Sequence, residues 1–289
     1  MTIQILQTGV SQPDNTKGYI EHATVAATAC LENSNVGTDE IDLLINVGNY
    51  RDDNMCEPSI AVLIQHALGI NLNPLTHPVK AHTFSFDLMN GACGLLNALQ
   101  VANAILSTKD GRYALLVSGD AHPSGQEHSD FPIQHASAAI LLERSKTNGF
   151  STFSFKTTDS FEGRTGFLDL DVHGLESRHS IITEGCIDEG RASEFAHNVV
   201  SAYITQQEIN PDTTELLIAH PDESFQNTLA SKLQMNQCSA SASTMRDLHT
   251  ANLGFALDRL QNMGTTKDVL CVVVGSGITV GCTLYRGES

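Results

Sequence analysis

The chain has 289 residues, of which 41% are hydrophobic and 17% are charged, a composition typical of a globular protein with one large or two small domains. Its formal net charge of −17 argues against nucleic acids and anionic membranes as partners, because both attract basic surfaces. The first residues lack a basic segment followed by an apolar core, and no apolar run reaches membrane-spanning length, so we expect a cytoplasmic protein. The 7 cysteines have no close pairs, which favours free thiols over disulfides.

Helices and buried strands alternate along the chain, and the order repeats. In the first half, periodicity predicts strands over 40–48, 113–118 and 136–142, a strand in the segment that begins at His82, and helices over 17–31, 59–68 and 93–106. In the second half it predicts strands over 150–157, 214–221, 238–243, 269–274 and 279–285, and helices over 192–207, 223–233 and 252–263. The repeat predicts an α/β protein of two pseudo-symmetric halves, 1–145 and 146–289, with helices on both faces of the strands.

Cys93 lies where a predicted strand turns into a predicted helix. Helix N-terminal amides and the helix dipole stabilise a thiolate at such a position, which lowers the thiol pKa and favours a nucleophilic role. Gly91, Ala92 and Gly94 leave room for a substrate to approach the sulfur. The alternative is that Cys93 is an inert buried side chain, because free cysteine is among the most buried residue types.

The duplication predicts that residues from the two halves meet. In α/β sheets, ligands bind beyond the carboxyl ends of the strands. Aligning the halves matches Cys93 with the loop 246–252 and His220 with 48–49, so these loops are expected to lie near a pseudo-twofold axis. Beside a thiol, His220 can act as a base and then donate a hydrogen bond to an oxyanion; otherwise it ends its strand and bonds the backbone.

Three further positions are candidates. The turn Gly275-Ser276-Gly277 either presents a backbone amide to an oxyanion or forms a tight hairpin, and its glycine spacing does not match a dinucleotide-binding loop. His249 and Asn252 stand at the start of the last predicted helix, where Asn252 is a typical N-cap. No histidine pair has metal-ligand spacing beside a carboxylate, and no Cys-x-x-Cys occurs, so no metal site is expected.

The segment 86–105, with Asn-Gly-Ala-Cys-Gly around Cys93, and the strand 113–119 closely resemble the nucleophile region of β-ketoacyl-acyl-carrier-protein synthase III enzymes. The similarity continues in the family's order at 42–47, at 136–140, at His220 and in the terminal glycine-rich strand pair, so that it covers almost the whole chain. It implies the thiolase fold, with duplicated halves in a five-layer αβαβα arrangement, and activity as an acyltransferase.

The resemblance also implies roles for individual residues. Cys93 would accept the acyl group, His220 would be the catalytic histidine, and the backbone amides of Cys93 and Ser276 would form the oxyanion hole. Such enzymes pass the acyl group to a second nucleophile by ping-pong kinetics. The implied substrate is an acyl-coenzyme A or acyl-carrier-protein thioester, with no cofactor. Dimerisation would use the strand beside the nucleophile, in a homodimer or with a homologous ketosynthase.

The chain departs from the family's pattern at three places. The family's asparagine in a Gly-Asn-Thr run has no clean match: Asp247 aligns with it without gaps, and small shifts offer His249, Thr250 or Asn252. The usual Gly-Asp-Gly-Ala-Gly run is Ile-Gln-His-Ala-Ser at 133–137. The N-terminal tryptophan and arginine that clamp coenzyme A have no match, and the chain contains no tryptophan. Loss of the asparagine would weaken decarboxylation more than acyl transfer.

These observations predict a ketosynthase III-like enzyme that forms an acyl-Cys93 intermediate and condenses or transfers it in a secondary-metabolite or specialised fatty-acyl pathway. One alternative is a non-catalytic or co-catalytic subunit of a heteromeric ketosynthase. Another is an O- or N-acyltransferase, or a thioester hydrolase, without decarboxylative condensation. The presence of both Cys93 and His220 favours a catalytic chain, because a purely structural subunit has no chemical need for either.

Overall fold

The computed structural model describes residues 2–72, 82–108, 111–174, 178–241, 246–264 and 266–287. Their strands form a nine-stranded sheet of order β3-β2-β4-β5-β1-β6-β11-β10-β9 and a two-stranded sheet, β7-β8. The strands are β1 (Thr2–Ser11), β2 (Ile41–Asn46), β3 (Phe84–Asp87), β4 (Tyr113–Asp120), β5 (Ala136–Ser145), β6 (Gly149–Thr157), β7 (Thr165–Phe167), β8 (Ile182–Glu184), β9 (Glu215–Ala219), β10 (Val269–Gly275) and β11 (Thr279–Arg286). The α-helices are α1 (Tyr19–Glu32), α2 (Ile60–Leu68), α3 (Gly94–Thr108), α4 (Leu170–His173), α5 (Glu189–Gln206), α6 (Glu223–Leu233) and α7 (Asn252–Met263).

The strand order repeats about the middle of the large sheet. On one side β2 is parallel to β4, and β5 is antiparallel to both β4 and β1. On the other side β9 is parallel to β10, and β11 is antiparallel to both β10 and β6. A single Cα pair, Ile3 with Phe150, joins β1 to β6 at the junction. The predicted duplication is therefore visible as two matching strand sets, although the boundary between 145 and 146 stays a prediction.

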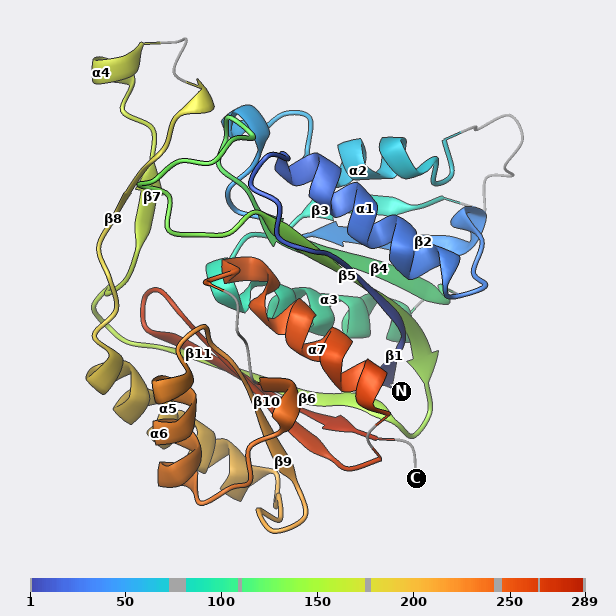
Figure 1. Cartoon of the computed structure of the whole chain (residues 1–289). Coiled ribbons are helices and arrows are strands. Elements are labelled where there is room, and N and C mark those ends of the chain that lie inside the picture. Colours follow the sequence, from blue (N-terminus) through green and yellow to red (C-terminus); the bar gives the residue numbers. More distant parts are fainter. Residues whose placement is uncertain are drawn as a thin grey trace.

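Helices α3 and α7 lie side by side between the two strand sets, α1 and α2 cover the outer face of the first set, and α5 and α6 cover the second (Figure 1). The apolar residues follow this layering. A central core joins residues of both halves around α3 and α7, and a separate core lies under each outer helix pair. This arrangement confirms the predicted α/β fold class with helices on both faces of the strands. The β7-β8 ribbon and α4 extend away from the main sheet (Figure 1).

Glycines allow the central helices to approach the sheet. A Cβ on Gly254 of α7 would lie 2.5 Å from Ala138 Cβ of β5, and a Cβ on Gly281 of β11 would lie 2.6 Å from Leu96 Cδ2 of α3. Both distances are far below van der Waals contact, so only glycine fits at either position. The start of α3 is thereby held against β11, and the start of α7 against β5.

Two elements differ from the sequence-based expectation. The long strand β1, which lies in the middle of the sheet, was not predicted, because its polar residues (Gln4, Gln7 and Thr8) interrupt the apolar pattern. In the described part of the strand predicted at 238–243 the prediction is wrong, because Ser239–Ser241 forms a 3₁₀ turn; residues 242 and 243 lie outside the described residues. The physical reason is that the Ser241 hydroxyl accepts the Ile218 N–H at 2.9 Å, so a side chain occupies the donor that a strand ladder would use.

Among the described residues, no helix has the length and apolar character needed to cross a membrane.

Candidate active site

Cys93 ends the 3₁₀ turn Gly91–Cys93, directly before α3. Its side chain is 1% exposed, and its thiol donates to the carbonyl oxygen of Thr279 on β11 at 3.7 Å. Gly275, at the end of β10, covers the sulfur: a Cβ on this glycine would lie 3.6 Å from Cys93 Sγ. The sulfur therefore lies just beneath the β10–β11 turn, and it is the absence of a side chain at Gly275 that keeps the space beside it open.

The resting thiol is not the activated thiolate that its position suggests. Burial raises the pKa of Cys93 to about 12, which outweighs the lowering expected from the amides at the start of α3. The hydrogen bond from the thiol to Thr279 also favours the protonated form. Cys93 is thus held neutral, and its proton has to leave as part of the reaction with a substrate.

The two amides predicted for the oxyanion hole differ in their bonding. The Cys93 N–H donates to Asn90 O at 3.1 Å within the 3₁₀ turn. In the β10–β11 turn, the amides of Gly277 and Ile278 donate to Glu162 O, whereas the Ser276 N–H has no acceptor among the residues that the structure describes. Because an unpaired amide in a cavity wall is suited to an anionic oxygen, the geometry favours Ser276 over Cys93 as the donor.

His220 follows β9 and is held in one orientation. Its Nδ1 accepts the Asp222 N–H at 3.2 Å, and its ring stacks on Phe225 with the centroids 4.1 Å apart. A neutral ring whose Nδ1 accepts carries its proton on Nε2, and Nε2 lies 3.7 Å from Glu189 Oε2. Burial lowers the pKa of His220 more than the charge of Asp247 raises it. His220 therefore presents a neutral N–H donor to the cavity, which suits an oxyanion better than it suits proton removal.

Asp247, the residue aligned with the family's asparagine, is in a network rather than free. Its Oδ2 accepts from Arg164 at 3.0 Å, and its Oδ1 accepts the His249 N–H and the Asn252 side-chain amide at 2.8 and 3.0 Å. Burial raises the pKa of Asp247. The charge and N–H of His249 and the Arg164 guanidinium lower it by more, so that the pKa lies below its usual value. Asn252 also accepts the Leu248 N–H, so its amide group holds the turn before α7 and is not free for catalysis.

The imidazole of His249 is oriented by a contact at its Nδ1. Its Nδ1 lies 3.1 Å from Oδ2 of Asp120, a fully buried carboxylate at the end of β4. Its Nε2 faces the opposite strand-to-helix turn, 3.4 Å from where a Cβ on Gly91 would lie. Burial alone would lower the pKa of His249, but the charge and hydrogen bond of Asp120 raise it above its usual value.

Two cavities meet at these residues. One of about 180 Å³ is lined by His220, Glu189, Asp222, Asp247 and Cys186, and by the Ala92 and Gly275 that flank the sulfur. The second, of about 420 Å³, is lined by Asn49, Tyr50, Met89, Gly91 and Phe161, among others. Arg164, His249 and Ser276 line both. The predicted meeting of the loops 48–49, 91–93, 220 and 246–252 is thus seen in the structure, since all of them contribute to this pair of cavities.

Several site residues were missed from the sequence. Asp120 carried a usable signal, because it is the charged residue that ends a buried strand whose carboxyl end faces the site. Glu189 carried none, since it stands in a polar segment at the start of α5. Within the described part of the chain, no group of His, Cys, Asp and Glu side chains has the geometry to hold a metal ion.

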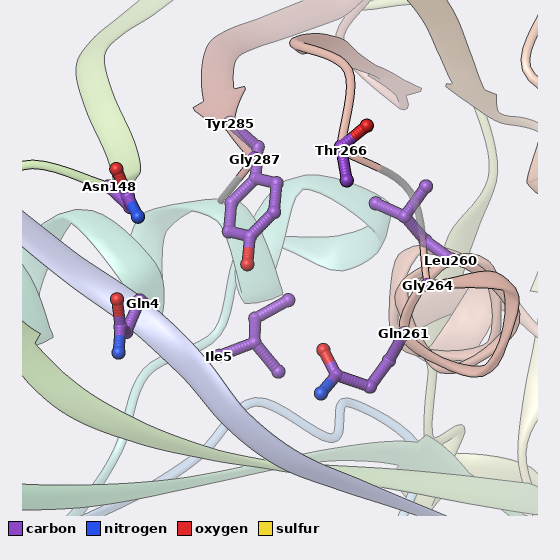
Figure 2. A pocket seen from close by; sticks show the side chains of 9 residues that line it. All are labelled: Gln4, Ile5, Asn148, Leu260, Gln261, Gly264, Thr266, Tyr285 and Gly287. Carbon is purple, nitrogen blue, oxygen red and sulfur yellow. The ribbon is translucent and has the colours of Figure 1, made fainter. Parts of the chain in front are cut away.

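Another cavity, of about 200 Å³, lies away from this chemistry (Figure 2). It is found where α7 ends, between β1 and the end of β11, and its lining includes Gln4, Gln261 and Tyr285. Helix α7 begins beside His249, so its length separates this cavity from the candidate site. The lining contains no cysteine or histidine, and we do not assign it a catalytic role.

Comparison with known proteins finds sequence similarity to two kinds of named enzyme. No family model matches it. A β-ketoacyl-[acyl-carrier-protein] synthase III from Rickettsia bellii is 23% identical over 293 residues, which cover 97% of this chain and 89% of that protein. An acyl-CoA:acyl-CoA alkyltransferase from Xanthomonas campestris is 34% identical over 98 residues, which cover 34% of this chain and 26% of that protein.

Solved structures show the same relationship at the level of the fold. The priming β-ketosynthase of the R1128 polyketide pathway superposes with a TM-score of 0.78 at 16% identity, covering 99% of this chain and 96% of that one. The 3-oxoacyl-(acyl carrier protein) synthase III of Pseudomonas aeruginosa superposes with a TM-score of 0.77 at 15% identity, covering 100% and 99%. Together with the repeated strand order, these likenesses show that the chain has the fold of the β-ketoacyl synthase III and priming β-ketosynthase structures.

Proposed function

We propose that this protein is an acyltransferase in which Cys93 takes an acyl group from a thioester and passes it to a second nucleophile. The observation that carries the proposal is the placement of the Cys93 sulfur beneath Gly275, beside a cavity that presents two donors, the His220 Nε2–H and the Ser276 amide. The names of the full-length relatives agree with this enzyme class. No cofactor takes part in the chemistry proposed.

The first half-reaction exchanges one thioester for another. The sulfur of Cys93 attacks the thioester carbonyl, and the oxygen becomes an oxyanion that the His220 N–H and the Ser276 amide stabilise. When the carbonyl re-forms, the bond to the donor sulfur breaks. The thiol proton of Cys93 leaves with the departing thiolate, so that an acyl-Cys93 enzyme and a free donor thiol are formed.

The burial of the Cys93 thiol suits this order of reaction steps. A neutral thiol in a dry site is protected from oxidation and from adventitious acylation until a thioester displaces the surrounding groups. The neutral state of His220, which burial favours, keeps its N–H available without adding a permanent charge to the cavity. We place the acyl group in the specialised fatty-acyl or secondary-metabolite class, because no residue of the chain cleanly matches the asparagine of the fatty-acid initiation enzymes.

Intact-protein mass spectrometry tests the proposal. Wild-type protein and the Cys93→Ala variant are incubated with acetyl-, octanoyl- and lauroyl-coenzyme A, and then with the same acyl groups on a carrier protein. We expect one adduct on the wild type and none on Cys93→Ala. Cys186→Ser is the matched control, because Cys186 is exposed and lines the same cavity, and this variant should keep the adduct. Failure of every donor to modify wild-type Cys93 would overturn the proposal and favour a non-catalytic subunit.

A further inference from the structure

Asp120 and His249 form a buried pair that the first half-reaction does not use. Asp120 Oδ1 accepts the amides of Asn49 and Tyr50 at 3.0 and 2.8 Å, and Oδ2 accepts the amide and hydroxyl of Thr250 at 3.0 and 2.7 Å as well as facing His249 Nδ1. Both oxygens of this carboxylate thus act as hydrogen-bond acceptors. An acceptor at Nδ1 fixes the proton of a neutral imidazole on that nitrogen, so the lone pair of His249 lies on Nε2.

The backbone at His249 is held in an unusual conformation. Its φ of 49° is in the left-handed region, which residues other than glycine rarely adopt, and Gly91 in the matching turn before α3 has the same φ of 49°. Here the conformation brings the imidazole to the wall shared by both cavities, facing the turn that carries Cys93.

The two histidines of the site have opposite tautomers. The Asp222 amide occupies Nδ1 of His220 and leaves Nε2–H as a donor, whereas Asp120 occupies Nδ1–H of His249 and leaves Nε2 as an acceptor. One ring is therefore prepared to hold an oxyanion and the other to remove a proton. An acyl transfer to a protic nucleophile needs both of these actions at the same carbonyl.

The charge of the lining restricts the acceptor. The carboxylates of Glu189, Asp222 and Asp247 surround the smaller cavity, and the guanidinium of Arg164 is already paired with Asp247. An acceptor that carries its own carboxylate, such as a malonyl group, would meet like charge here. A neutral alcohol or a protonated amine would not be repelled, and the positive charge of the amine would be attracted by the same carboxylates.

We propose that His249, oriented by Asp120, is the general base of the second half-reaction and that the acceptor is a hydroxyl or amino compound without an acidic group. The proposal rests on the acyl-Cys93 enzyme proposed above. An amine that enters protonated first gives one proton to the solvent. The neutral nitrogen or oxygen of the acceptor then attacks the acyl carbonyl while one of its protons passes to His249 Nε2. The new C–N or C–O bond forms, the C–S bond to Cys93 breaks, and the proton moves from His249 to the Cys93 thiolate. The products are an amide or ester and the free thiol.

The test separates the two half-reactions. Acyl-Cys93 enzyme is formed from an acyl-coenzyme A, freed of excess donor, and chased with ethanolamine, with ethanol or with malonyl-coenzyme A while the adduct is followed by intact mass. For His249→Gln we expect the adduct still to form, so that its decay can be measured, and a loss of about 100-fold or more in that decay with ethanolamine. His66→Gln, an exposed histidine at the end of α2, should behave like the wild type. Partial recovery of the decay rate of His249→Ala by added imidazole would support a base rather than a structural role.

Three outcomes would overturn the proposal. Equal decay of the adduct in wild type and His249→Gln would show that His249 is not the base. Faster decay with malonyl-coenzyme A than with ethanolamine, accompanied by release of carbon dioxide, would assign the acceptor to the condensing class. The decay rate of the wild type should also rise with pH through a pKa above 6.5, since burial and Arg164 lower the pKa of His249 but Asp120 and Asp247 together raise it by more, and a flat profile would contradict this. Absence of any adduct on the wild type would overturn the proposed function first.

Discussion

At the scale of the residue, the site is built so that its groups are neutral or paired before substrate arrives. Cys93 is kept as a thiol by burial, His220 as a neutral ring by burial, and Asp247 as a paired carboxylate by Arg164. The thiol must therefore be activated by the approach of the thioester, so the rate of acylation depends on access to the Cys93 sulfur.

Gly275→Ala should remove that access without unfolding the protein. The added Cβ would lie 3.4 Å from Ala92 Cβ and 3.6 Å from Cys93 Sγ, which are ordinary contacts, so the variant should fold with little change in stability. The methyl group would occupy the space through which a thioester reaches the sulfur. We expect formation of the acyl-Cys93 adduct to slow at least 10-fold while the midpoint of thermal unfolding changes little.

Gly281→Ala is the contrasting variant on the neighbouring strand. Its Cβ would lie 2.6 Å from Leu96 Cδ2 and 2.9 Å from the Phe155 ring, so it overpacks the core and should cost about 1–3 kcal/mol in the free energy of unfolding. If Gly275→Ala were acylated as fast as the wild type, the sulfur would have to be reached from another side.

At the scale of the element, helix α6 couples stability to the site through Asp222. The carboxylate of this residue caps α6 by accepting the Ser224 N–H at 2.7 Å, and its backbone N–H holds His220 Nδ1. Asp222→Ala should lower the free energy of unfolding by about 1 kcal/mol, because it deletes the cap. The backbone N–H is unchanged, so acylation of Cys93 should be retained. Urea unfolding measures the first effect and intact mass the second.

Asp222→Ser is the matched control for the cap. Serine also caps helices well, and the substitution removes the same charge, so it should restore most of the stability lost in Asp222→Ala. Equal losses in the two variants would mean that the charge of Asp222, rather than its cap, stabilises α6.

The elements themselves show what the sequence could and could not predict. Strands such as β4 and β10 were predictable because they are buried on both faces and read as continuous apolar runs. The repeat then placed Cys93, His220 and the 246–252 loop together. The described part of the segment 238–243 was misjudged because the Ser241 hydroxyl accepts the Ile218 N–H in place of a strand partner. No sequence pattern reveals this hydrogen bond. The pairing of His249 with Asp120 was equally hidden, because it depends on two loops 129 residues apart in the chain.

At the scale of the whole molecule, the free edge of the large sheet predicts self-association. Strand β3 is at the edge of the sheet beside the Cys93 turn, and its Phe84 side chain is 58% exposed and lies against Phe86. Among the described residues no strand pairs with the outer side of β3, and such an edge with an exposed aromatic side chain favours pairing with a second copy. Phe84→Glu should therefore shift the protein toward the monomer in light scattering coupled to size exclusion. Val62→Glu on the exposed face of α2 is the control, and dissociation of both variants alike would argue against the β3 edge.

Buried histidines make the stability of the whole molecule dependent on pH. Burial is the largest cause of a lowered pKa at each of four of them, His22, His122, His135 and His220, and the pKa of His122 falls to about 4. The unfolded chain binds protons at these side chains near pH 6.5, whereas the native protein resists protonation there. Stability is then complete above about pH 6.5 and is lost as the pH falls toward 4. The raised pKa values of His249 and Glu189 act in the opposite direction but involve fewer groups.

The free energy of unfolding should consequently decrease between pH 7 and pH 5, a range in which carboxylates of lowered pKa, such as Asp14 and Asp247, remain ionised. Urea unfolding at pH 7, 6 and 5 measures the slope. His122→Gln should give a shallower slope than the wild type whatever its absolute stability, since glutamine cannot take up a proton at a position where His122 is only 4% exposed. A wild-type profile that is flat or rises toward pH 5 would mean that the Asp120–His249 pair, which gains stability on protonation, dominates the titration of the native protein.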